Sequence, residues 1–166
     1  MMKLTLLALL SFPFCQPALG ASLGDKVVMR SQVDHGYVQI LVLKEMEITS
    51  HNKSNDSIAI QLSFRPFIGQ PTVVSSIAQM QIIRKGEAEV KEIFQNCESE
   101  KIKGKIETLQ VASKMISACK IFIANHGDQW ISPQVPFGVV KSDVIIEDGS
   151  HEVTELVMFR YGKNEY

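Results

Sequence analysis

The sequence predicts a mainly β (α+β) fold, in which a strongly curved antiparallel sheet or half-open barrel carries one or two short helices. Three observations lead to this prediction. Short segments that alternate apolar and polar residues follow one another along most of the chain, polar turns separate them, and only one stretch shows helical spacing. Strands with one apolar side are typical of a sheet wrapped around a core or cavity, and the sequence leaves open whether the barrel is closed or half-open.

Residues 1–20 have the layout of a secretory signal peptide. Lys3 gives a positive start, Leu4–Phe14 is an apolar core too short to span a bilayer, and Ala18–Gly20 offers small residues for cleavage. Residues 21–166 are then one exported β-rich domain. We expect it in the periplasm of a Gram-negative bacterium.

Charge gives no sign of an electrostatic partner. The formal net charge is −1, it becomes −2 without Lys3, and acidic and basic residues are well mixed. Nucleic acid and anionic membrane surfaces attract strongly basic proteins, so neither is expected as a partner. No later segment approaches the roughly 20 apolar residues of a membrane span, so no transmembrane segment is expected.

Tyr37–Ile48 and Ser57–Phe64 predict a long β-hairpin. The intervening His51–Asp56 is a polar turn with no apolar residue. Both strands place apolar residues at alternate positions. Those that would line an apolar cleft, or equally fill a core, are Val38, Ile40, Val42, Ile58, Ile60, Leu62 and Phe64.

Further strands are predicted at Val73–Arg84, Glu107–Val111, Met115–Ala124, Phe137–Ile146 and His151–Tyr161. The Asp-Gly turn in Glu147–Ser150 joins the last two. Ala88–Gly104 is ambiguous, because it is rich in Glu and Lys but carries apolar residues at helical spacing. It predicts a short helix or an irregular excursion.

Cys97 and Cys119 follow the signal segment, an even count in an exported chain. An oxidising compartment favours their pairing, although spacing alone leaves two unpaired buried thiols open. The absence of a C-x-x-C spacing argues against a redox role. We therefore expect a structural disulfide that ties the ambiguous segment to a strand.

The stretch DQWISPQVPFGVVKSD predicts a rigid corner, consisting of a strand, a prolyl turn and a strand. Trp130 can bury a large apolar surface, and either packs in the core or lines the cleft. Pro133 and Pro136 fix the backbone and withhold N–H donors, so this segment cannot be a central strand. Gly138 permits tight packing before the next strand begins.

The same residues resemble a family motif. The order Trp130-x-Ser132-x-x-Val135-Pro136-x-Gly138-x-Val140-Lys141, then Glu155-Leu156 and Tyr161-Gly162, resembles a motif of uncharacterised exported bacterial proteins. Upstream, Gly36-Tyr37-Val38 is similar to the family's G-x-W-V-x-Y and Gln81–Gly86 to its R-M-I-x-K-x-G strand, whereas V-P-A-G-x-F-x-C is matched only at Val111-Ala112 and Cys119. Such proteins resemble the periplasmic lipoprotein-carrier superfamily. That resemblance implies a half-barrel whose sheet cups an apolar ligand under a helical lid.

Catalytic and metal-binding patterns are missing from the sequence. It has no G-x-S-x-G, P-loop or dinucleotide motif. His151–Glu155 lacks the second histidine of a metalloprotease helix and lies in a predicted strand; the remaining histidines, His35, His51 and His126, are scattered. We therefore expect no enzyme activity, cofactor or metal site.

The expected function is non-enzymatic binding of a hydrophobic ligand, either a lipid or a lipidated protein. The alternative is a structural or protein-interaction module of the cell envelope without a small-molecule ligand. Such a module would bind an envelope protein through its sheet surface or edge.

Overall fold

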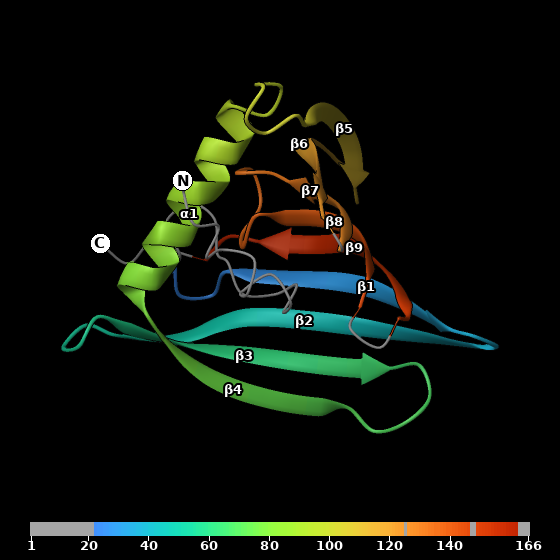
Figure 1. Cartoon of the computed structure of the whole chain (residues 1–166). Helices are drawn as coiled ribbons and strands as arrows, with labels where there is room; N and C mark the ends of the chain where they lie inside the picture. Colours follow the sequence, from blue (N-terminus) through green and yellow to red (C-terminus); the bar gives the residue numbers. More distant parts are fainter. Residues whose placement is uncertain (1–21, 125, 147–148, 163–166) are drawn as a thin grey trace.

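The computed structural model describes residues 22–124, 126–146 and 149–162, and in them nine strands form one antiparallel sheet that does not close into a barrel (Figure 1). The sheet order is β4-β3-β2-β1-β9-β8-β7-β6-β5. The strands are β1 (Lys26–His35), β2 (Val38–Asn52), β3 (Ser57–Pro66), β4 (Thr72–Gln79), β5 (Lys105–Val111), β6 (Lys114–Ile123), β7 (Gly127–Ile131), β8 (Val139–Ile145) and β9 (His151–Arg160), and the helix is α1 (Met80–Gln95). The predicted fold class, a mainly β fold with a strongly curved antiparallel sheet or half-open barrel and one or two short helices, is confirmed.

The sheet consists of two meanders that meet where β1 pairs with β9. The first meander runs from β1 to β4 at one edge, and the second from β5 at the other edge to β9. Helix α1 connects the two edges and lies across one face of the sheet (Figure 1). We call the face toward α1 the inner face and the opposite one the outer face.

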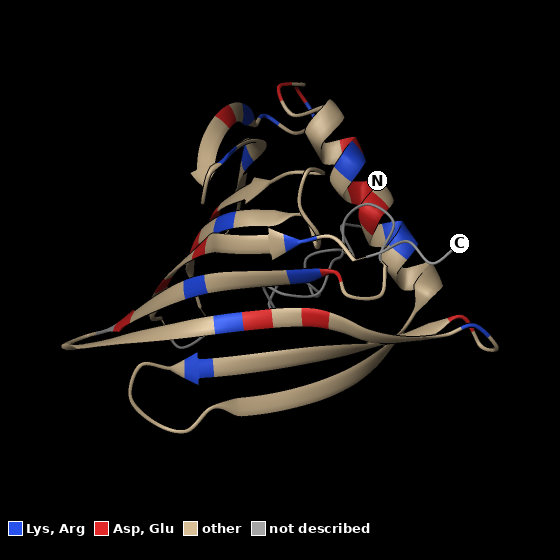
Figure 2. Cartoon of the chain, turned by 180° about the vertical axis from the view of Figure 1, so that it is seen from behind, with Lys and Arg blue, Asp and Glu red and all other residues tan. Residues whose placement is uncertain are grey.

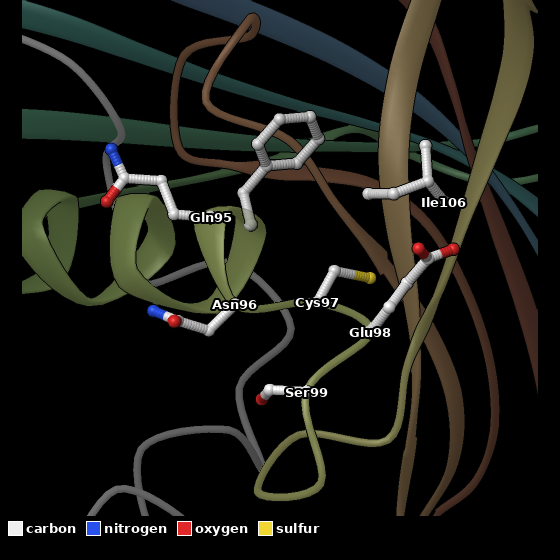
Figure 3. A pocket seen from close by; sticks show the side chains of 7 residues that line it. Gln95, Asn96, Cys97, Glu98, Ser99 and Ile106 are labelled. Carbon is white, nitrogen blue, oxygen red and sulfur yellow. The ribbon is translucent and has the colours of Figure 1, made fainter.

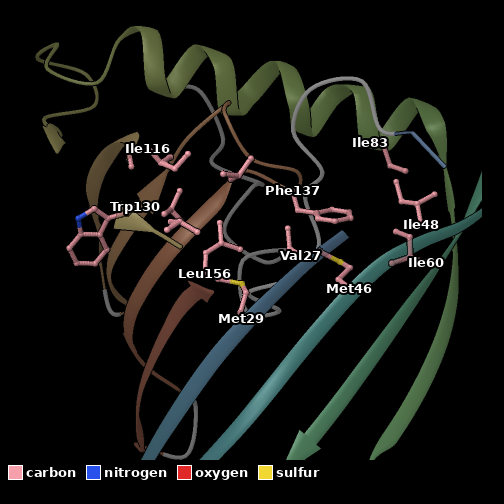
Figure 4. Close-up of a cluster of buried hydrophobic side chains, with 14 of the residues drawn as sticks. Val27, Met29, Met46, Ile48, Ile60, Ile83, Ile116, Trp130, Phe137 and Leu156 are labelled. Carbon is pink, nitrogen blue, oxygen red and sulfur yellow. The ribbon is translucent and has the colours of Figure 1, made fainter. Parts of the chain in front are cut away.

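The predicted hairpin is present as β2 and β3. Its register pairs Met46 with Leu62 and Ile48 with Ile60, so the alternating apolar residues of both strands share the inner face. The main core lies between this face, α1 and the β7–β8 loop (Figure 4). Its buried members include Val27, Met29, Met46, Ile48, Ile58, Ile60, Ile83, Val135, Phe137, Val140 and Leu156.

The strand predicted at Val73–Arg84 is wrong in its second half, where helix α1 begins instead. Only Thr72–Gln79 is extended, and the helix begins at Met80. Its buried residues are Met80, Ile83, Gly86, Glu87 and Val90, a spacing of three and four that suits a helix against a sheet. The segment Gln81–Gly86, which resembles a family strand, is therefore helical here.

Two strands were not predicted separately. β1 was missed, and β7 was predicted only as the unbounded strand that enters the corner. β2 continues to Asn52, four residues beyond the predicted end at Ile48, and the remaining boundaries agree with the prediction to within two residues. The helix predicted within Ala88–Gly104 is the second half of α1.

The corner between β7 and β8 is a turn that packs into the core. The N–H of Ser132 donates to Gly138 O at 2.8 Å, which closes the turn. Gly138 has a φ of 75°, a conformation that glycine adopts easily. Val135, Pro136 and Phe137 are buried, so this turn fills the space between the sheet and α1 (Figure 4).

A disulfide joins Cys97 to Cys119, with the two sulfur atoms 2.07 Å apart. Cys97 follows the end of α1, and Cys119 lies on β6. The bond therefore fastens the end of the helix to the sheet, as expected from the sequence. Gly104 packs against it, because a Cβ at this position would lie 2.8 Å from Cys119 Sγ and 2.9 Å from Cys97 Sγ.

Candidate binding face

The register brings the seven predicted cleft residues to the inner face, but it places them in two environments. Ile58 and Ile60 are buried under α1 as part of the core. The others lie farther from the helix and are half-buried or exposed. Val74 on β4 joins them, because it pairs with Leu62. We call this partly exposed group the open stripe; it consists of Val38, Ile40, Val42, Leu62, Phe64 and Val74.

Trp130 does not lie with the open stripe but is a buried member of the core cluster, which is one of its two predicted places. Across the sheet, Trp130 pairs with Lys141, Lys141 with Glu155, Glu155 with Arg30 and Arg30 with Leu43. Residues directly opposite one another point to the same side. Leu43 is the neighbour of Val42 on β2, so Trp130 and the open stripe lie on opposite faces.

On the outer face, Trp130 is held by charged neighbours. Its indole N–H donates to Glu107 Oε2 at 2.7 Å, and the Nζ atoms of Lys120 and Lys141 lie 4.8 and 5.2 Å from the ring centroid. The Trp130 hydrogen bond, helped by the charges of Lys105 and Lys120, lowers the pKa of Glu107 against the opposing effect of desolvation. These contacts have a structural role, because they hold Trp130, and with it the corner between β7 and β8, in place.

A row of polar side chains crosses the inner face next to the open stripe. Val42 pairs with Ser31, Ser31 with Thr154, Thr154 with Ser142 and Ser142 with Gln129. These four polar residues, the inner polar row, are buried. Within the described part of the chain, Thr154 Oγ1, Ser142 Oγ and Gln129 Oε1 have no hydrogen-bond partner. Unpaired buried polar atoms are costly and uncommon in folded proteins, so this row is the most unusual polar feature of the inner face.

A buried ion pair lies beside the row. Glu152 Oε1 accepts hydrogen bonds from Ser31 Oγ and from Lys44 Nζ. The Lys44 and Glu152 side chains are only 12% and 5% exposed, so the two charges offset each other away from water. Sequence analysis missed this pair. Lys44 lies two residues from both Val42 and Met46 on β2, so strand alternation places all three side chains on the inner face.

The two best-formed depressions among the described residues lie away from the open stripe. The larger, of about 240 Å³, is beside Cys97 at the end of α1 and is lined mostly by polar side chains (Figure 3). The smaller, of about 60 Å³, lies between the β5–β6 turn and β9. Under α1, Val135 and Phe137 occupy the space that a carrier would leave for its ligand.

The described residues hold no group of three or more His, Cys, Asp or Glu side chains that could bind a metal ion. His151 Nε2 lies 2.6 Å from Asp143 Oδ1, and His51 Nε2 lies 3.4 Å from Asp56 Oδ1. Asp56 also pairs with Arg84, at 3.4 Å, and both histidine contacts lie at the surface. Within the same residues, no helix has the length and apolar character that crossing a membrane requires.

No protein-family model matches the sequence, and no curated protein matches it. Among solved structures, the chain is similar to a Bacteroides fragilis protein assigned as exported, with a YmcC-like fold. The two share 7% sequence identity with a TM-score of 0.46, over 89% of this chain and 100% of the other. A likeness at this level does not bear on function.

Proposed function

We propose that this protein is an exported, non-enzymatic binding protein for a hydrophobic ligand, either a lipid or a lipidated protein, that works in a Gram-negative periplasm. The open stripe carries the proposal. It is a partly exposed, largely apolar strip on the inner face of a curved sheet, interrupted at Lys44, and its strands extend beyond α1 (Figure 1). Apolar residues gathered on a concave surface are typical of ligand sites.

The ligand chemistry follows from what borders the stripe. Val42 pairs directly with Ser31, so an acyl chain lying on β2 and β3 ends at the inner polar row. That row is buried, so it bounds the apolar surface with polar residues and offers no accessible group to the ligand. Because Lys44 is already paired with Glu152, a neutral head group fits better than a charged one.

Adjacent residues of β2 provide a matched test. Ile40 points inward and is 45% exposed, whereas Leu41 points outward and is 39% exposed. Ile40→Asp places a carboxylate where the acyl chain would lie, and Leu41→Asp places one on the other face. The probe is a fluorescent monoacylglycerol, with the corresponding fatty acid as the charged comparison.

We expect Ile40→Asp to weaken monoacylglycerol binding roughly tenfold or more, because burying a charge against an acyl chain is costly. Leu41→Asp should bind as the wild type does, and both variants should keep the wild-type circular dichroism spectrum. Tighter binding of the fatty acid would contradict the neutral head group. Equal binding by both variants, or no binding by the wild type, would contradict the open stripe as a ligand site.

The alternative, an envelope interaction module, is favoured by the filled core beneath α1. Native mass spectrometry of the exported protein from its host distinguishes the two functions. Lipid that co-purifies with the wild type but not with Ile40→Asp supports ligand binding. Repeated absence of any lipid supports the module.

A further inference from the structure

We propose that the protein forms a symmetric dimer in which β4 pairs antiparallel with β4 of a second copy. β4 is the last strand of the sheet and pairs only with β3 in the described part of the chain. Every residue of β4 except Ala78 is exposed. Such an edge offers a row of unpaired N–H and C=O groups to an incoming strand.

The composition of this edge favours self-pairing. From Pro66 to Ile83 the chain has no charged residue, and β4 carries no coloured charge in Figure 2. Proteins protect exposed edges with charged side chains, because like charges oppose pairing. The opposite edge, β5, has that protection, with Lys105 and Glu107 3.6 Å apart at its start. The two edges of the same sheet thus differ in this respect.

The hydrogen-bonding direction of β4 is suitable. The N–H of Met80 donates to Asp56 O at 2.8 Å, which continues the β3–β4 ladder. In an antiparallel ladder the donors and acceptors alternate between the two sides of a strand. Even-numbered residues of β4 therefore bond to β3, and the N–H and C=O groups of Val73, Ser75 and Ile77 point outward.

One register satisfies both the hydrogen bonds and the side chains. A two-fold axis through Ser75 pairs the outward-directed groups of Ser75 with those of its own copy. It also sets Val73 opposite Ile77 of the second copy, and Ile77 opposite Val73. These side chains are 55% and 78% exposed and lie on the same face, so the dimer covers two apolar pairs.

The flanking residues obey the same symmetry. Ile68 and Ile82 lie equally far from Ser75 along the chain, and both are exposed. The axis through Ser75 therefore brings the β3–β4 loop of one copy toward the start of α1 in the other. A symmetric pairing of this kind closes on itself, whereas β4 on β5 of another copy would continue as an open chain of molecules.

Charge placed on the axis tests the proposal. Ser75→Asp sets two carboxylates opposite each other, and Thr108→Asp is the matched control at the centre of the exposed β5 edge. A third variant, Val73→Glu with Ile77→Lys, creates two opposite-charge pairs in the proposed register. Mass is measured by sedimentation equilibrium of the purified full chain over a concentration series.

We expect the wild type and Thr108→Asp to dimerise below about 100 µM. Ser75→Asp should raise the dimer dissociation constant roughly tenfold or more. The single changes Val73→Glu and Ile77→Lys should also weaken the dimer, and their combination should restore it. A monomeric wild type, or a dimer that Ser75→Asp leaves unchanged, overturns the proposal. If the wild type is monomeric but retains another protein that Ser75→Asp loses, the edge belongs to a different partner and the second copy is excluded.

Discussion

The indole N–H of Trp130 on β7 donates to Glu107 Oε2 on β5, so the bond reaches across the intervening strand β6. Lys120 on β6 pairs with Trp130 and places its ammonium group over the ring. Together these contacts hold the edge strand β5 to the interior of the sheet. They make the outer face of the second meander a stabilising surface.

Replacing Glu107 should change how stability depends on pH. The hydrogen bond from Trp130 lowers the folded pKa of Glu107 below its ordinary value of 4.5. The contribution of the bond is therefore complete well above pH 4.5 and is lost as the pH falls through the folded pKa. We expect Glu107→Gln to lower the free energy of unfolding by about 1 kcal/mol at pH 7 and by less at pH 3.

Urea denaturation at the two pH values measures this difference. Glu100→Gln, at an exposed position, serves as the control and should match the wild type at both. An equal loss at pH 7 and pH 3 would mean that Glu107 contributes by packing rather than through its charge.

Removal of the Trp130 ring should be among the most destabilising changes on the outer face. Trp130→Ala deletes a buried aromatic side chain, and such changes cost about 3–5 kcal/mol. Trp130→Phe keeps a ring beneath the two lysines but loses the N–H donor, so we expect a loss nearer 1 kcal/mol. Thermal unfolding of both variants measures the effect. Monoacylglycerol binding by Trp130→Phe should stay at the wild-type level, since the open stripe is on the other face.

Loss of the disulfide should free the end of α1. In a chain-entropy description, Cys97→Ala with Cys119→Ala should lower the free energy of unfolding by about 3 kcal/mol. Hydrogen exchange should accelerate most in the last turn of α1. The reduced wild type is the control and should behave as the double variant does. Unchanged exchange at Phe94 and Gln95 would show that packing alone holds the helix.

Tyr161 should make the fold sensitive to alkali. Desolvation of the half-exposed side chain, together with the nearby charge of Asp25, raises the pKa of Tyr161 to about 12. Between pH 10 and 12 the folded protein therefore holds a proton that the unfolded chain releases, so stability falls as the pH rises through this range. Tyr161→Phe has no such proton, and we expect its unfolding midpoint to fall less steeply there. Parallel slopes for the two proteins would contradict this account.

The hairpin was predictable because its physics is local. β2 and β3 alternate cleanly, and a polar turn joins them. β1 was missed because Ser31, a polar residue, points inward between Met29 and Val33 and breaks the alternation. Whether a polar side chain faces the core depends on partners distant in sequence, here Thr154 and Glu152.

The start of α1 could not be predicted from the sequence for a different reason. Ile82 and Ile83 are β-branched and favour a strand, yet Ile83 packs in the core as part of a helix. The sequence also could not show which face of the sheet each residue would take. Trp130 and Val42 lie on opposite faces because of the order of the strands, which their neighbours in sequence do not reveal.

The pairing of β1 with β9 has a consequence for how the molecule acquires its structure. Lys26 lies opposite Arg160, so the seam between the two meanders joins nearly the first described residue to nearly the last. Until β9 pairs with β1, no strand pairing joins β1–β4 to β5–β8, and α1 is the segment that links them along the chain. Contacts of such long sequence separation form slowly, on a timescale of about milliseconds to seconds. The nine-stranded sheet is therefore complete only once β9 has paired with β1.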